Sequence, residues 1–291
     1  MISKIFLQVL GRPWLIEESQ AHYWAGIARE IFITKSLDAV PNRDTRSNGF
    51  SFEFPRVNAN GDQTAKGPVQ LVRIEGPLMK YDSSAFLGME TLQQGIRAAA
   101  NDDTVKSIIL IIDSPGGTVD GTHNLAREIE KVKKPVVAFV NGYMCSAAYW
   151  IGSGAREIIC DDANGGYNST IGSIGTIAQW YDTKAADKKA GIKEIIVTAS
   201  KSKRKTSYWD QIDKGVYDRL IKKLDNLNET FLSAIQKNRA GKLNLEREDV
   251  LEGDIYDGKD ALKYGLIDKI ADLPYAIDRS LKLARHMKPA F

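Results

Sequence analysis

The sequence is short of the residues on which several classes of protein depend. Its 291 residues include only two cysteines, Cys145 and Cys160, which are too few for a disulfide framework and favour a reducing compartment. No cluster of cysteine, histidine and carboxylate residues has metal-ligand spacing, so we expect neither a metal site nor a cofactor. No run of roughly 18 apolar residues is present either, so no transmembrane helix is expected.

A strong charge of one sign is also missing. Forty Lys and Arg residues against 37 Asp and Glu give a net charge of +3, which implies no general attraction to nucleic acid. The first residues contain a short apolar run, Ile5 to Leu10, but no long apolar core or small-residue cleavage site before Glu17. With 43% apolar and 26% charged residues, the composition is that of an ordinary globular protein. We therefore expect no membrane insertion and a cytoplasmic location.

The chain changes character near Gly67. Residues 1–66 include two polar stretches, PNRDTRSNGF and NANGDQTAKG, which are typical of loops or linkers, and a helix is expected over 17–33. After Gly67 the pattern alternates between strands and helices. We therefore predict an N-terminal appendage and linker over 1–66 and one main domain over 67–291.

Within the main domain, short apolar runs predict strands, and the near-continuous runs over 105–112 and 135–140 predict strands that are buried on both faces. The expected strands are 69–74, 105–112, 135–140, 157–160 and 193–197. Helical spacing is found over 84–100, 119–132, 146–152, 211–239 and 274–286. This alternation predicts an α/β fold with a mainly parallel sheet and C-terminal helices.

Two glycines directly follow the predicted strand over 105–112. The segment DSPGG contains Gly116 and Gly117, and glycines at a strand end let backbone N–H groups point into a cavity. Such groups can form an oxyanion hole, which stabilises negative charge on a carbonyl oxygen. The alternative is a tight strand-to-helix turn without a chemical role.

A serine stands at the expected start of a helix. Ser146 follows the strand PVVAFV and the residues NGYMC, and it precedes the small residues Ala147 and Ala148. Such a serine is often only an N-cap, but a helix N-terminus also favours developing negative charge. Carboxyl ends of parallel strands share one edge of a sheet, so Ser146 and the glycine segment are expected to face one crevice. Cys145 is interpreted as a buried apolar residue, and Ser173 in IGSIG as groove structure.

A nucleophilic serine needs a general base, and histidine poorly supplies it here. His22 lies in the appendage, His286 lies near the C-terminus, and His123 is expected at the surface or core edge. The run SKSKRK, residues 200–205, follows the predicted strand KEIIV and offers lysines instead. A lysine acts as a base only when neutral, a state that burial and nearby positive charge favour. The alternative is a solvated basic loop.

Four ordered segments resemble the signal peptide peptidase A family, to which phage prohead proteases also belong. They are IDSPGGTVDG, KPVVAFVNGYMCSAAYWIGSGA, STIGSIGTIAQWYD and DIYDGKDALKYGLIDKI. The resemblance covers about residues 68–272. It implies a crotonase-like fold, shared with Clp-type proteases, and catalysis by a Ser–Lys dyad.

The resemblance also assigns residues to roles. Ser146 matches the nucleophile and Lys203 the general base, although Lys201 and Lys205 compete and Ser200 replaces a glycine common in the family. The oxyanion hole would comprise Gly116, Gly117 and Ala147.

The resemblance further implies that the chain cleaves polypeptides as a homo-oligomer whose site is completed between subunits. A prohead protease that processes capsid or scaffold protein is the first expectation, located in the host cytoplasm or inside the procapsid. The alternatives are a cytoplasmic peptidase that degrades signal peptides or protein fragments, an acyl-CoA enzyme of the crotonase type and a non-catalytic capsid-assembly protein.

Overall fold

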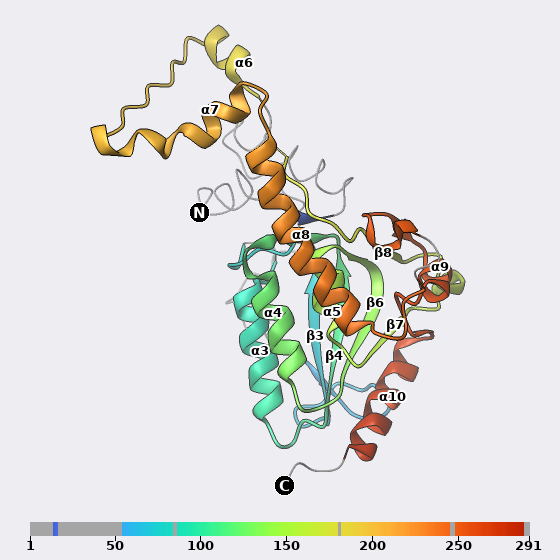
Figure 1. Ribbon diagram of the computed structural model, residues 1–291. Coiled ribbons are helices and arrows are strands. Elements are labelled where there is room, and N and C mark those ends of the chain that lie inside the picture. Colours follow the sequence, from blue (N-terminus) through green and yellow to red (C-terminus); the bar gives the residue numbers. More distant parts are fainter. Residues whose placement is uncertain (1–13, 17–53, 84–85, 180–181, 245–247, 288–291) are drawn as a thin grey trace.

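A mixed, mainly parallel sheet forms the centre of the protein (Figure 1). The computed structural model describes residues 14–16, 54–83, 86–179, 182–244 and 248–287. The sheet has the strand order β10-β7-β6-β4-β3-β2, with β8 paired to β6 and β9 to β8. Its parallel centre is formed by β3 (Val69–Glu75), β4 (Ser107–Ser114), β6 (Val136–Cys145) and β7 (Glu157–Cys160). The peripheral strands are β2 (Arg56–Val57), β8 (Thr170–Gly172), β9 (Ile255–Tyr256) and β10 (Lys269–Ile270).

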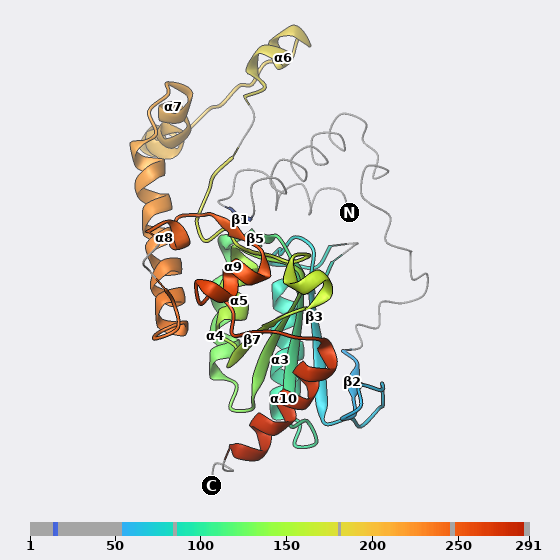
Figure 2. The same ribbon diagram turned by 90° about the vertical axis from the view of Figure 1, so that its right-hand side faces the viewer.

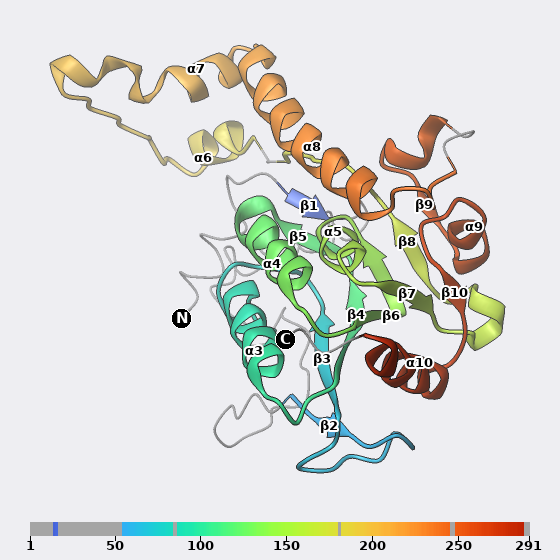
Figure 3. The same ribbon diagram turned by 60° about the horizontal axis from the view of Figure 1, so that its bottom comes forward.

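Both faces of the sheet are covered, which explains why its strands are apolar throughout. Along β4, Ile108, Leu110 and Ile112 enter one core cluster, while Ile109 and Ile111 enter a second. Successive residues of a strand point to opposite faces, so each cluster belongs to one face. The helices α3 (Met89–Asn101), α4 (Val119–Lys131) and α5 (Ala147–Ser153) cover the first face, and α10 (Leu273–His286) the second (Figures 2 and 3).

The structure confirms the predicted α/β class with a mainly parallel sheet and C-terminal helices. The four strands predicted between residues 69 and 160 all form. α3 follows β3, α5 follows β6, and α4 follows the short segment that comes after β4. The C-terminal part adds α8 (Asp218–Asn238), α9 (Gly258–Lys263) and α10. Among the residues described, no helix has both the length and the apolar character needed to cross a bilayer.

Two short N-terminal segments pair with strands of the main domain. β2 pairs antiparallel with β3, and β1 (Trp14–Ile16) pairs antiparallel with β5 (Gly116–Thr118). The helix expected over 17–33 lies outside the described residues. The division of the chain near Gly67 stays a prediction.

The segment between β8 and α8 forms an arm that extends away from the sheet (Figure 1). It contains α6 (Lys184–Lys189), the 3-10 helix η2 (Ser200–Lys205) and α7 (Ser207–Asp213). The strand predicted over 193–197 was wrong: Ile195 is 74% and Val197 89% exposed, and the segment is paired with none of the described strands. Its apolar pattern suits a strand, but a strand also needs a neighbour.

The helix predicted over 211–239 is divided. α7 ends at Asp213 and α8 begins at Asp218, with Gly215 at a φ of 73° between them. Positive φ is unfavourable for residues with a side chain, so glycine allows the turn here. As a result, α7 belongs to the arm, and α8 leads from the arm back to the core.

Two buried contacts fix α8 to the rest of the molecule. Near its middle, Phe231 stacks on Trp150 of α5, with ring centroids 5.0 Å apart. At its end, Arg239 is 1% exposed and its Nη1 donates to Oδ2 of Asp268 at 2.8 Å. The first contact joins α8 to α5, which begins directly after Ser146, and the second joins the end of α8 to the residue before β10.

We expect Trp150→Ala to lower the free energy of unfolding by about 3–5 kcal/mol, because it leaves a cavity under α8. Trp150→Phe keeps an aromatic ring against Phe231 and is expected to lose much less. Chemical denaturation followed by circular dichroism measures both. Equal losses in the two variants would show that the stacking contact does not fix α8.

The Arg239–Asp268 pair predicts a pH dependence of stability. Burial raises the pKa of Asp268, but hydrogen bonds from Arg239 and Lys242 outweigh it and hold the pKa below its ordinary value. A carboxyl whose pKa is lower in the folded state stabilises the fold above its unfolded pKa, near about 4. This stabilisation is therefore lost as the pH falls through the lowered folded value.

Asp268→Asn is expected to cost about 3–5 kcal/mol at neutral pH, since it leaves the buried Arg239 without its charged partner. The cost should shrink in acid, where the original carboxyl is itself protonated. Asp278→Asn is the matched control, because its ion pair with Lys282 is exposed and contributes about 0.5 kcal/mol or less. Urea titrations at neutral and acid pH test this, and a cost independent of pH would contradict it.

Candidate active site

Ser146 occupies a strained position between β6 and α5. Its φ of 52° and ψ of −117° lie in a region that residues with a side chain rarely adopt, at a cost of about 1–3 kcal/mol. The backbone is held there from both sides: the Ser146 N–H donates to the Gly172 carbonyl at 2.8 Å, and its carbonyl accepts from Trp150 N–H at 3.0 Å. The residue is 0% exposed, and its Oγ lies 3.4 Å from the Gly175 carbonyl oxygen.

The glycine segment forms the short strand β5 beside this serine. Ser114, two residues before Gly116, pairs with Met144, two residues before Ser146. A Cβ atom on Gly117 would lie 1.8 Å from the carbonyl oxygen of Leu78, so this position admits no side chain without a shift of the backbone. The glycine prediction thus has a steric basis, because β5 lies directly against the chain at Leu78.

Backbone N–H groups near Ser146 include those predicted to bind an oxyanion. The Gly116 N–H donates to Oγ of Ser114 at 3.2 Å, and that hydroxyl donates to the Gly76 carbonyl at 2.7 Å. Ala147 is the first residue of α5, so its N–H has no partner within the helix. The structure therefore brings Ser146, Gly116, Gly117 and Ala147 to the same end of the sheet, while their roles stay predictions.

β8 and the residues after it lie on the opposite side of the end of β6 from β4. β8 runs parallel to the end of β6, with Cys145 paired to Gly172. Ser173 follows at a φ of 49°, and its N–H donates to the Asp254 carbonyl at 2.7 Å. Ser173 thus lies next to the strand that pairs with the end of β6, and its interpretation as groove structure stays a prediction.

Asp113, the first residue of the DSPGG segment, makes a contact at this end of the sheet that was not predicted. Its Oδ1 accepts a hydrogen bond from the Tyr143 N–H at 3.0 Å, where β6 changes register against β4. A Cβ atom on Gly142 would lie 2.4 Å from the same oxygen. An aspartate near the end of one strand, together with a glycine in the next, is the signal that could have predicted this contact.

The candidate lysines lie far from Ser146 within one chain. Lys201, Lys203 and Lys205 belong to η2 in the arm, and all three are exposed. Figures 1 and 2 show the arm beyond the far end of α8, away from the start of α5. A single chain therefore does not bring Lys203 and Ser146 together.

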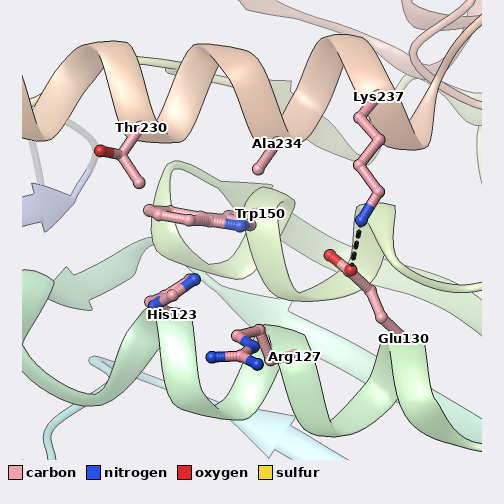
Figure 4. A pocket seen from close by; sticks show the side chains of 7 residues that line it. All are labelled: His123, Arg127, Glu130, Trp150, Thr230, Ala234 and Lys237. Carbon is pink, nitrogen blue, oxygen red and sulfur yellow. Dashed lines mark hydrogen bonds and ion pairs between the residues drawn. The ribbon is translucent and has the colours of Figure 1, made fainter.

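His123 lies in a hollow of about 190 Å³ between α4 and α8 (Figure 4). Its ring faces Trp150, with the centroids 5.9 Å apart, and Lys237 and Glu130 form an ion pair at the rim. His286 is exposed and bonds to the Lys282 carbonyl, while His22 lies outside the described residues. His123 is thus at the edge of the core, as expected.

Comparison with protein families gives two matches. The profile of peptidase family S49 matches residues 128–286, more than half of the chain. The Clp protease profile matches residues 89–158, which include Gly116, Gly117 and Ser146. The predicted Clp-protease-like α/β fold is thereby confirmed.

Curated relatives include three named for proteolysis. A candidate protease of Methanocaldococcus jannaschii is 31% identical over 65% of this chain and 59% of its own length. Protease 4 of Haemophilus influenzae is 29% identical over 74% of this chain and 34% of its own. Capsid assembly protease C of Escherichia phage lambda is 26% identical over 92% of this chain and 62% of its own. The chain thus spans between about a third and three fifths of the length of these relatives.

Among solved structures, a membrane-bound stomatin-specific protease is similar at a TM-score of 0.49 and 20% identity. The similarity covers 73% of this chain and 84% of that one.

Proposed function

The chain belongs to peptidase family S49, and on that premise we propose that it is a serine endopeptidase with Ser146 as its nucleophile. The observation that carries the proposal is the strained Ser146 at the start of a buried helix, beside the backbone of β5. Strain of this kind persists only where the surroundings enforce it, and it gathers at functional sites. The proposed reaction is acyl transfer from a peptide to Ser146 and then to water.

Each step of this reaction has a residue to perform it. Neutral Lys203 takes the proton of Ser146, whose Oγ attacks a peptide carbonyl and forms the tetrahedral intermediate. The N–H groups of the glycine segment and of Ala147 stabilise the oxyanion, and one such donor typically contributes about 10²–10³ in rate. The lysine then gives its proton to the departing amine, and water releases the acyl group from Ser146.

The proposed dyad joins two subunits. Lys203 is exposed in the arm, whereas Ser146 is wholly buried in the core, so the base has to come from a neighbouring chain. The arm also exposes Ile195, Ile196 and Val197, which a subunit contact would remove from water. The same contact would desolvate a lysine and so favour its neutral form. A head-to-tail contact of this kind closes into a ring.

For the biological role, we propose a prohead protease that cleaves capsid or scaffold protein. The lambda capsid assembly protease is similar over 92% of this chain, including residues before Gly67. Such an enzyme works in the host cytoplasm or inside the procapsid. Incubation with scaffold and capsid proteins of the encoding genome tests this role. Cleavage of denatured substrates without cleavage of either protein would favour a general peptidase of signal peptides or protein fragments.

A fluorophosphonate probe tests the reaction class, because it forms a covalent bond with an activated serine. We expect labelling at Ser146, located by mass spectrometry of the peptide that contains it, and cleavage of casein. An acyl-CoA enzyme or a non-catalytic assembly protein would show neither result.

A further inference from the structure

β5 has two edges, and one of them is bound to the chain at Leu78. The Leu78 N–H donates to the Gly116 carbonyl, and the Thr118 N–H donates to the Leu78 carbonyl, both at 2.8 Å. Successive residues of a strand direct their N–H and C=O groups to opposite edges. The N–H and C=O of Gly117 therefore point to the other edge of β5.

That other edge is occupied by β1, from the N-terminal part of the same chain (Figure 3). The two strands are antiparallel, with Leu15 opposite Gly117 and Ile16 opposite Gly116. Ile16 is 3% exposed, so its side chain is buried. Among the strands described, β1 pairs with β5 alone. The backbone hydrogen bonds that hold β1 as a strand are therefore those with β5.

An extended peptide substrate would use the same edge. Peptides commonly bind to proteins by adding a strand to an exposed edge, where main-chain hydrogen bonds hold them. β5 begins two residues after Ser114, which pairs with Met144 near the end of β6, so we expect a peptide on this edge to pass close to Ser146. In the structure, where β1 occupies this edge, Ser146 is 0% exposed.

We propose that β1 is an intramolecular substrate mimic that closes the site, so that polypeptide substrates have to displace residues 14–16 from β5. The inference rests on the proposed role of Ser146 as nucleophile. The chain then has a closed form, with β1 on β5, and an open form in which the Gly117 edge accepts a peptide. Three residue pairs hold β1, so a longer substrate strand that pairs with the same edge can replace it.

Leu15→Pro in the full chain tests the mimic, since proline removes the N–H that faces Gly117. We expect fluorophosphonate labelling and cleavage of a short peptide to be about two- to tenfold faster, the factor expected for one lost hydrogen bond. Leu15→Ala is the matched control, because it removes the same side chain but keeps the N–H, and it should stay within about twofold. Unchanged or slower labelling of the folded Leu15→Pro protein would show that β1 is a structural strand and overturn the proposal.

A locked variant answers the same question if the proline disturbs folding. Trp14 and Thr118 form a non-hydrogen-bonded pair, in which Cα atoms typically lie about 4.5 Å apart, within the range of disulfides. Trp14→Cys combined with Thr118→Cys is expected to label at least about tenfold more slowly when oxidised than when reduced. Equal rates in the two redox states would contradict the mimic.

Amide hydrogen exchange separates this inference from the proposed function, because it needs no catalysis. In a Ser146→Ala background, the Gly117 amide should exchange faster with Leu15→Pro than with Leu15→Ala. Adding a short extended peptide should slow it again. If no variant is labelled but exchange responds in this way, the proposed function fails and the strand exchange stands. Equal exchange rates would overturn the inference even in an active enzyme.

Discussion

Ser146→Ala is expected to abolish peptidase activity, with a loss of at least about a thousandfold, because no other group replaces a missing nucleophile. The fold should survive. The Ser146 side chain makes one long contact of 3.4 Å, to Gly175, so the free energy of unfolding should change by about 1 kcal/mol or less. Casein cleavage and fluorophosphonate labelling measure the activity, and urea denaturation measures the fold.

Ser173→Ala provides the control for this prediction. Ser173 is also a serine at positive φ beside the site, and its variant should still be labelled by the probe. Undiminished cleavage by folded Ser146→Ala protein would eliminate Ser146 as the nucleophile. Labelling lost only in Ser173→Ala would transfer the role to that residue.

Lys203→Ala should be as damaging as Ser146→Ala, because residues that act as one unit each abolish the reaction when removed. Lys201→Ala and Lys205→Ala remove neighbouring lysines of η2 and are expected to be milder. All three side chains are exposed, so none of these changes should unfold the protein. Full activity of Lys203→Ala, with loss in one of the other two variants, would reassign the base to that lysine.

Mixing two inactive proteins tests whether the site is shared. Ser146→Ala and Lys203→Ala chains are dissociated, combined and allowed to reassemble. A contact between unlike subunits places an intact serine against an intact lysine, so activity should return. No recovery from well-mixed oligomers would place both residues in one subunit, and an active species that sediments as a monomer would exclude a shared site.

The parts of the fold that could be predicted are those with local apolar patterns. The strand over 105–112 is apolar throughout because helices cover both of its faces, and the sequence shows this directly. The segment 193–197 shows a similar pattern, yet in the structure it lies in the arm, where no described strand pairs with it. The local apolar pattern shows whether a segment is suited to a strand. It does not show whether another strand is available to pair with that segment.

The candidate site divides in the same way. Ser146 and the two glycines stand in short motifs at strand ends, so sequence alone placed them at one edge of the sheet. The pairing of Leu15 with Gly117 joins residues about a hundred positions apart through backbone groups that every sequence possesses. Likewise, no local feature of residues 200–205 shows how far the arm carries Lys203 from the serine.

The proposed sharing of the dyad between chains would make dilution a form of regulation. If the base resides on an arm that only a neighbour can use, the concentration of competent sites follows the law of mass action and not the amount of chain. Isolated chains released into a cell would then be harmless to other proteins. Crowding of many copies into a small volume would activate them together, without any change in the chemistry of a single subunit.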